Sequence, residues 1–153
     1  MLAHLKRTVM GSLLRMSSHI LQGVEIRDLV PGERGGYLSF DLIDILRLIG
    51  PRVLDAHWRC RFVECIGETA GQLDEISDRG VSISGEELMR IVSGIFQTID
   101  GDFEARDGEA ENAWLVIKAI DSSLFEVWSD DLELLRRLRE TFQQVSDLPL
   151  DAA

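Results

Sequence analysis

The sequence predicts an α+β fold, in which helices pack on one face of an antiparallel sheet of about four strands. Apolar and polar residues alternate strictly over 53–65, as they do in a strand with one buried face. In several other segments apolar residues recur every three or four positions, which is the spacing of amphipathic helices. The resulting order, α-α-β-α-α-β-β-β-α, lacks regular β-α-β alternation, and strands joined by short turns pair in antiparallel fashion.

Length and composition predict a single globular domain. The chain has 153 residues, of which 45% are hydrophobic and 28% are charged. We expect an amphipathic N-terminal helix at 1–22, one α+β domain at 23–146 and a frayed tail at 147–153. The apolar stripe of the first helix consists of Leu2, Leu5, Val9, Leu13, Met16 and Ile20.

The first half of the domain is predicted to contain two helices separated by the alternating strand. Ser39 is a candidate cap for a helix that ends at Gly50, which a proline follows. After the strand at 53–65, a polar helix is expected from Thr69 to Arg79, and Gly80 ends it. These segments are the second, third and fourth elements, α-β-α, of the predicted order.

The second half is predicted to begin and end with a helix. Ser84 and Glu87 have the spacing of a capping box, and an apolar stripe at helical spacing follows over 88–95. The period then changes to two over 96–106, and apolar segments at 114–120 and 124–128 read as two further strands. Asp130, with Glu133 three residues later, is the expected cap of the last helix.

The negative charge is concentrated in the later part of the chain. The net charge is −11, with +3 on residues 1–61 and −14 on residues 62–153. An acidic surface repels nucleic-acid phosphates and anionic lipid, so we expect no nucleic acid and no membrane among the partners. Two interpretations stay open: the charge attracts a basic protein, or it simply keeps a small protein in solution.

The two cysteines, Cys60 and Cys65, indicate a reduced cytoplasmic protein. On one continuous strand their odd spacing points them to opposite faces, so they neither bridge nor share a metal. Cys60 shares the apolar side of its strand, where an inert thiol is expected. Glu64 and Glu68 lie beside Cys65, and their negative charge is expected to raise its pKa.

Two rows of charged residues form the candidate binding site. They are His57, Arg59 and Arg61 in the strand at 53–65, and Asp100, Asp102 and Glu104 in the strand at 96–106. Arginine offers a planar fork of donors, so the first row is a candidate site for a carboxylate or phosphate. Alternatively, if the two strands are neighbours, the rows pair as a charge ladder worth roughly 0.2–1 kcal/mol for each pair.

We expect no catalytic residues, no metal site and no cofactor. After Asp100 and Asp102 the sequence lacks the further oxygen ligands of a calcium loop. Only one histidine lies firmly within the domain, and no nucleophile motif is present. The tryptophans Trp58, Trp114 and Trp128 are expected in the core, because a base-stacking platform needs surrounding lysine and arginine.

These observations predict a non-catalytic protein-binding module, whose process and oligomeric state the sequence leaves open. One version is an inhibitor or immunity-type protein that masks a basic, nucleic-acid-processing partner, because opposite charge speeds encounter. The alternative is a small hydrolase that uses the carboxylates of Asp100, Asp102 or Glu104, with Arg59 as an electrostatic clamp. A third hypothesis is self-association through the N-terminal helix.

Overall fold

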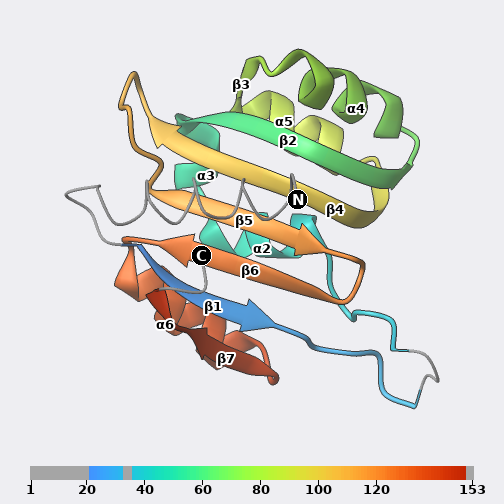
Figure 1. The fold of residues 1–153 in the computed structure, drawn as a ribbon, viewed down its shortest axis with the longest axis vertical. Helices are drawn as coiled ribbons and strands as arrows, with labels where there is room; N and C mark the ends of the chain where they lie inside the picture. Colours follow the sequence, from blue (N-terminus) through green and yellow to red (C-terminus); the bar gives the residue numbers. More distant parts are fainter. Residues whose placement is uncertain (1–20, 33–35, 151–153) are drawn as a thin grey trace.

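The computed structural model describes residues 21–32 and 36–150 and contains one seven-stranded sheet (Figure 1). The strands are β1 (Gln22–Ile26), β2 (Ala56–Gly67), β3 (Ser82–Ser84), β4 (Ile95–Asp107), β5 (Leu115–Ile120), β6 (Leu124–Ser129) and β7 (Val145–Leu148). Their order across the sheet is β3-β2-β4-β5-β6-β1-β7, and each neighbouring pair is antiparallel. The first strand therefore lies between two of the last strands.

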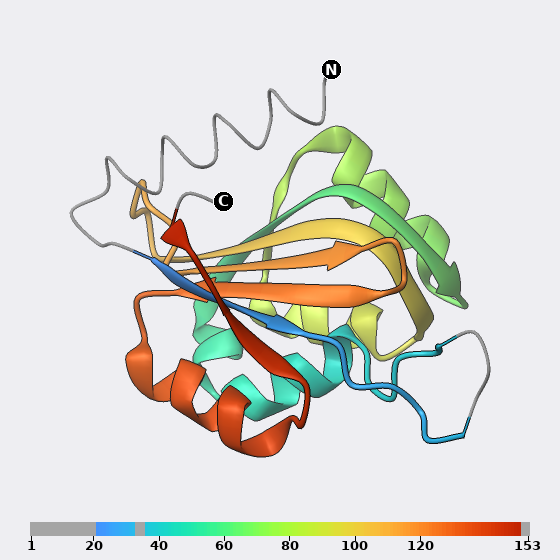
Figure 2. The ribbon, with the colours of Figure 1, turned by 60° about the horizontal axis from the view of Figure 1, so that its bottom comes forward.

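Five helices accompany the sheet in the described part of the chain. They are α2 (Leu42–Ile49), α3 (Arg52–Asp55), α4 (Ala70–Arg79), α5 (Gly85–Val92) and α6 (Leu132–Thr141). In Figure 2, α2 and α6 lie beneath the sheet, whereas α4 lies beside β2. The backbone N–H of Val63 in β2 donates to Ser77 Oγ of α4 at 3.2 Å, so α4 occupies the edge of β2 beyond the short strand β3.

The prediction of about four strands with helices on one face is wrong, although the class is broadly α+β. The predicted order lacks β1, β3 and β7, which have five, three and four residues. Such short segments show little periodicity of their own, and they are held by the backbone of longer neighbours. Asp147 and Leu148, expected in a frayed tail, pair with Val24 and Gly23. The predicted N-terminal helix falls mainly on residues 1–20, outside the described residues, and Gln22 belongs to β1.

The longer helices follow the predicted signals, with small shifts at their caps. Asp41 caps α2 in place of Ser39, and Asp131 caps α6 in place of Asp130. Gly80 ends α4 with φ of 64°, the left-handed conformation that glycine adopts readily. Ser84 Oγ accepts the N–H of Glu87 at 3.1 Å, which confirms Ser84 as the cap of α5. The other half of the predicted capping box is replaced, because the Glu87 carboxylate pairs with Arg90.

The alternating segment divides into a helical turn, a regular strand and a bulge. Residues 52–55 form α3, so the strand begins at Ala56 and not at Val53. At Phe62, where φ is 56°, one extra residue opposes β4 and the side chain is 51% exposed. The bulge reverses the alternation, so Cys65 packs against the same core as Cys60 and the predicted opposite orientation is wrong.

The main core lies between the sheet and the helices. Its large members include Trp58 and Phe103 from the strands and Leu46, Leu88 and Leu138 from the helices. A smaller apolar cluster of Leu21, Val116 and Trp128 lies on the opposite face of the sheet. All three tryptophans are buried, as the sequence predicted.

Candidate functional site

The two predicted rows of charged residues lie on neighbouring strands. In the β2–β4 register, Arg59 is opposite Glu104 and Arg61 is opposite Asp102. Opposite charges therefore face each other across the strand pair, as the charge-ladder hypothesis requires. The third position differs, because His57 is opposite Arg106 and no carboxylate stands there.

The central part of this ladder is unusually well buried. The Glu104 side chain is 4% exposed, and its carboxylate pairs with Arg106 Nη2 of the same strand at 2.9 Å. Asp102 lies between Arg61 of β2 and Lys118 of β5. Burial raises the pKa of Asp102, more than the positive charges of Lys118 and Arg61 lower it. The row continues into β6, where Lys118 is opposite Glu126.

Asp100 has a different role from the other two carboxylates. Its Oδ1 accepts the backbone N–H of Asp121 at 2.8 Å, at the turn between β5 and β6. Its neighbour across the strand pair is Glu64, so no arginine faces it in the register. The three predicted carboxylates are therefore not gathered around Arg59, although Glu104 lies opposite it.

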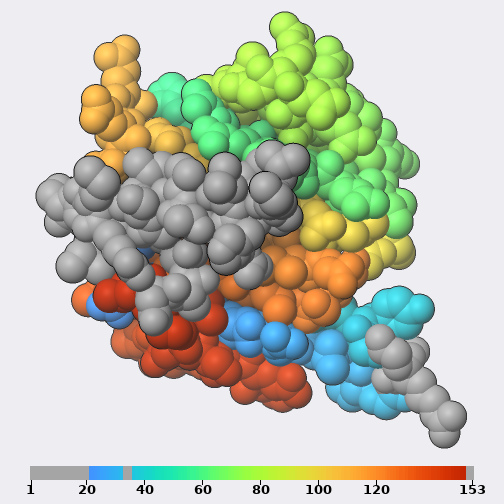
Figure 3. Space-filling model, viewed as in Figure 1, coloured from blue at the N-terminus to red at the C-terminus, as the bar shows by residue number. Residues whose placement is uncertain are grey.

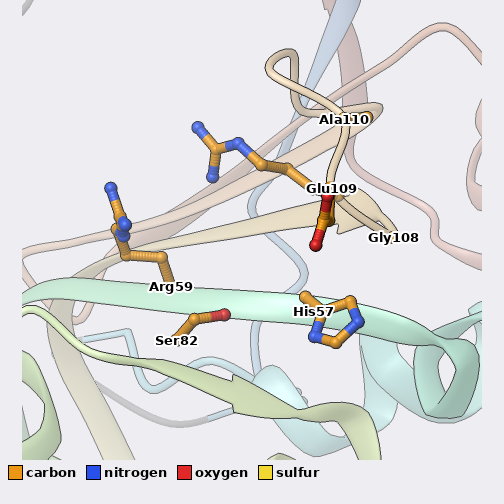
Figure 4. A pocket seen from close by; sticks show the side chains of 7 residues that line it. His57, Arg59, Ser82, Gly108, Glu109 and Ala110 are labelled. Carbon is orange, nitrogen blue, oxygen red and sulfur yellow. The ribbon is translucent and has the colours of Figure 1, made fainter.

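A pocket of about 350 Å³ lies at the end of the strand pair where β2 begins and β4 ends. Its lining combines residues from β2, β3, β4 and the following loop: His57, Arg59, Ser82, Arg106, Gly108, Glu109 and Ala110. Figure 4 shows the Glu109 carboxylate pointing from that loop toward β2, on the side of His57, whereas the Arg59 side chain extends from β2 into the space beside the loop. We call this the cationic pocket, because it holds two arginines and a histidine against one carboxylate.

The arginines of the cationic pocket are held in different ways. Arg106 Nε donates to the backbone carbonyl of Glu111 at 3.1 Å, and its Nη2 pairs with Glu104. Arg59 Nε is buried and has no hydrogen-bond partner among the described residues. A buried donor without a partner is costly, typically about 1–3 kcal/mol, so an acceptor that reached this guanidinium would be favoured.

Only part of this pocket is visible in the sequence. His57 and Arg59 share one face of an alternating strand. Arg106 joins them through the β2–β4 register, where it is opposite His57, and Ser82 joins them through the β2–β3 register, where it is opposite Arg59, so no local pattern predicts either residue. Conversely, Arg61, Asp100, Asp102 and Glu104 do not line the pocket.

Neither cysteine has the properties of a nucleophile. Both are free. Burial, and then the nearby charge of Glu104, raises the pKa of Cys60 to about 12. Burial, followed by the charges of Asp74 and Asp41, raises the pKa of Cys65 to about 11, so the expected rise is present but Glu64 and Glu68 do not cause it. Within residues 21–32 and 36–150, no group of three metal-ligating side chains comes together.

Comparisons with known proteins found no family model that matches the chain, and no similar curated protein or solved structure. Among the described helices, none combines the length and apolar character that crossing a bilayer requires.

Proposed function

We propose that the protein is a non-catalytic protein-binding module, whose cationic pocket receives a carboxylate group of a partner protein. The observation that carries this proposal is the meeting of His57, Arg59 and Arg106 around one open cavity. Guanidinium groups bind carboxylates through two parallel hydrogen bonds, and these charge-assisted bonds are stronger than neutral ones.

The size and charge of the site favour a single carboxylate over a nucleic acid. A polyanion needs a continuous basic surface, whereas this chain has a net charge of −11 and the loop beside the pocket carries Glu109 and Glu111. Because the Glu109 carboxylate already points into the cavity, a carboxylate from a partner fits the same space once Glu109 moves aside.

The overall charge favours a partner that is basic outside this contact. Residues 62–153 carry −14, and opposite charges on two proteins speed their encounter. An inhibitor or immunity-type role toward a basic, nucleic-acid-processing protein is consistent with this charge. The hydrolase alternative has less support, because Asp100 is bonded to a turn and Glu104 is paired with Arg106, away from a shared cavity with Arg59.

A cytoplasmic location is part of the proposal. Two free thiols in a chain of this length suit a reducing compartment. Acid quenching of intact cells, followed by alkylation under denaturing conditions and mass spectrometry, is expected to find Cys60 and Cys65 reduced. Oxidised cysteines would contradict this location.

The binding proposal is tested with a pair of matched tripeptides followed by NMR. Acetyl-Gly-Glu-Gly-amide is expected to shift the amides of His57, Ser82 and Gly108, and the glutamine version to bind about tenfold more weakly. Equal affinities for the two peptides would refute recognition of the carboxylate.

Three variants locate the binding. Arg59→Met keeps the aliphatic stem and is expected to weaken the glutamate peptide about tenfold. Glu109→Gln removes the competing carboxylate and is expected to strengthen binding about two- to fivefold. The control is Arg47→Met, an exposed arginine of α2 outside the pocket lining, which is expected to change nothing. Arg106 is left intact, since its loss would leave the buried Glu104 carboxylate without its cation.

A further inference from the structure

A second pocket lies at the other end of β4 from the cationic pocket. Its volume is about 310 Å³, and it is lined by Tyr37, Leu38, Phe40, Asp41, Phe96, Gln97, Thr98 and Ser122. In Figure 3 the loop after β4 and the chain around 28–32 and 36–38 stand out at opposite ends of the molecule. We call this second cavity the aromatic pocket.

The aromatic rings of this pocket are partly open to solvent. Phe96 is 82% exposed and Tyr37 is 63% exposed, although both are residues that usually bury most of their surface. Phe40 forms the deeper wall, and its ring packs against Phe125 and Phe142 of the core. The pocket therefore has a wall that belongs to the core and two exposed rings in its lining.

The charge of the pocket is negative. Asp41 is the single charged residue of the lining, and it has no cationic partner within the described part of the chain. Further carboxylates are close by in the chain. Asp44 lies in the first turn of α2, three residues after Asp41. Asp121 directly precedes Ser122, and its backbone N–H donates to Asp100 Oδ1. Among the described residues, no lysine or arginine lines the cavity.

The position of Asp41 at the start of α2 does not remove this negative charge. A helix N-terminus carries about half a positive charge. Here it is offset by two carboxylates, because Asp41 caps the helix and Asp44 Oδ2 accepts the Asp41 N–H at 2.8 Å. Asp41 Oδ2 is fixed by the backbone N–H of Thr98 at 3.0 Å and by its hydroxyl at 3.3 Å. The carboxylate is thus both oriented and unneutralised.

We propose that the aromatic pocket binds a lysine side chain of a partner protein, with the ammonium group at Asp41 and the aliphatic stem against Phe96 and Tyr37. Aromatic rings attract a cation through their negative faces and also cover its methylene groups. A basic partner, which the charge of −14 on residues 62–153 favours, offers such side chains. This second contact uses none of the residues of the cationic pocket, so it is independent of the carboxylate site.

The burial of the Asp41 carboxylate is consistent with this proposal. Burial raises the pKa of Asp41, and hydrogen bonds from Leu42 and Thr98 lower it by less. A cation that contacts this partly desolvated carboxylate stabilises its negative charge in place of the water that burial has removed. A neutral ligand of the same shape gives no such stabilisation.

The test uses the full chain and two tripeptides that carry no carboxylate, acetyl-Gly-Lys-Gly-amide and its norleucine counterpart, followed by NMR. The lysine peptide is expected to shift the amides of Phe96, Thr98 and Ser122, and to leave those of the cationic pocket unchanged. Norleucine has the same stem without the charge, and it is expected to bind at least about threefold more weakly. Equal binding of the two peptides, or no saturable shift with lysine, would overturn the proposal.

Two variants separate the charge from the rings. Asp41→Asn keeps the acceptor for Thr98 and is expected to weaken the lysine peptide about threefold to tenfold, without affecting norleucine. Phe96→Ala removes a highly exposed ring, so it is expected to leave the fold intact while weakening lysine about two- to fivefold. Leu132→Ala, at an exposed apolar position on α6, is the control. Unchanged binding in Phe96→Ala would overturn the role of the rings, even if Asp41→Asn fails to fold.

Discussion

Gly85, the first residue of α5, has no room for a side chain. A Cβ atom built on it would lie 1.8 Å from the carbonyl oxygen of Val53 and 2.6 Å from Cα of Leu54. Both are backbone atoms of α3, so a change of rotamer cannot relieve the contact. Gly85→Ala therefore requires α5 to move away from α3. Ser82 lies in β3, the strand that leads directly into α5, so we expect the wall of the cationic pocket to move with it.

The size of the effect follows from the geometry of the clash. Overpacking of a well-packed core costs about 1–3 kcal/mol, and a backbone contact of this kind belongs at or above the upper end. We expect Gly85→Ala to lower the free energy of unfolding by about 3 kcal/mol or more. At about 2–4 °C for each kcal/mol in a protein of this size, the melting temperature falls by about 6–12 °C.

Gly71 in α4 supplies a matched control. A Cβ atom there meets nothing within 4 Å and the backbone is ordinary helix. Gly71→Ala is expected to raise the free energy of unfolding by about 0.5–1 kcal/mol, because alanine loses less backbone entropy in a helix. Urea titrations followed by circular dichroism compare the two variants. A Gly85→Ala protein within about 1 kcal/mol of the parent would refute the close approach of α5 to α3.

Two further substitutions and the titration of the cysteines test other parts of the structure. Gly23→Ala places a Cβ atom 2.6 Å from the buried indole of Trp128, so it is expected to cost about 2 kcal/mol and to change tryptophan fluorescence. Ser84→Ala removes the cap of α5 and is expected to cost about 1 kcal/mol in a urea titration. Cys60 and Cys65, with pKa values raised to about 12 and 11, are expected to react with Ellman's reagent at pH 8 far more slowly than in the unfolded chain. Stability is expected to fall as pH rises from about 9 to 11, since the folded state keeps thiol protons that the unfolded state loses.

Each of these predictions has its own contrary result. An unchanged fluorescence spectrum and stability in Gly23→Ala would show that the indole does not pack on this glycine. Ser93→Ala, which removes a hydroxyl from the other end of α5, is the control for Ser84 and is expected to stay within about 0.5 kcal/mol of the parent. Thiols that react as fast in the folded protein as in urea would contradict the burial of the cysteines.

Sequence patterns predicted those parts of the fold that are determined by residues close together in the chain. The stripe of α5 with its Ser84 cap, and the end of α4 at Gly80, depend on residues a few positions apart. The short strands β1, β3 and β7 depend on partners distant in the chain, so their own residues carry little of the information. The bulge at Phe62 was missed because an alternating pattern assigns an aromatic residue there to the buried side.

Local patterns also predicted only part of the candidate site. The alternation of polar and apolar residues places His57 and Arg59 on the polar face of one strand, and it places Asp102 and Glu104 on one face of another strand. The sequence predicts that the two rows pair only if their strands are neighbours, and the β2–β4 register meets this condition by placing Arg61 opposite Asp102. The cationic pocket also needs Arg106 and the loop after it, whose closeness to His57 no local pattern contains.

The place of β1 between β6 and β7 has a consequence for synthesis of the protein. Val24 is opposite Val127 on one side and opposite Asp147 on the other, so about a hundred residues of chain separate it from its nearer partner. A ribosome adds about 5–20 residues each second, so β1 waits about 5–20 seconds after its own synthesis before β6 exists. During that interval Val24 and Ile26, which end in the core, have no strand to pair with. A nascent chain that ends before β6 therefore carries an unpaired apolar strand, and we expect this segment to be where chaperones engage the growing protein.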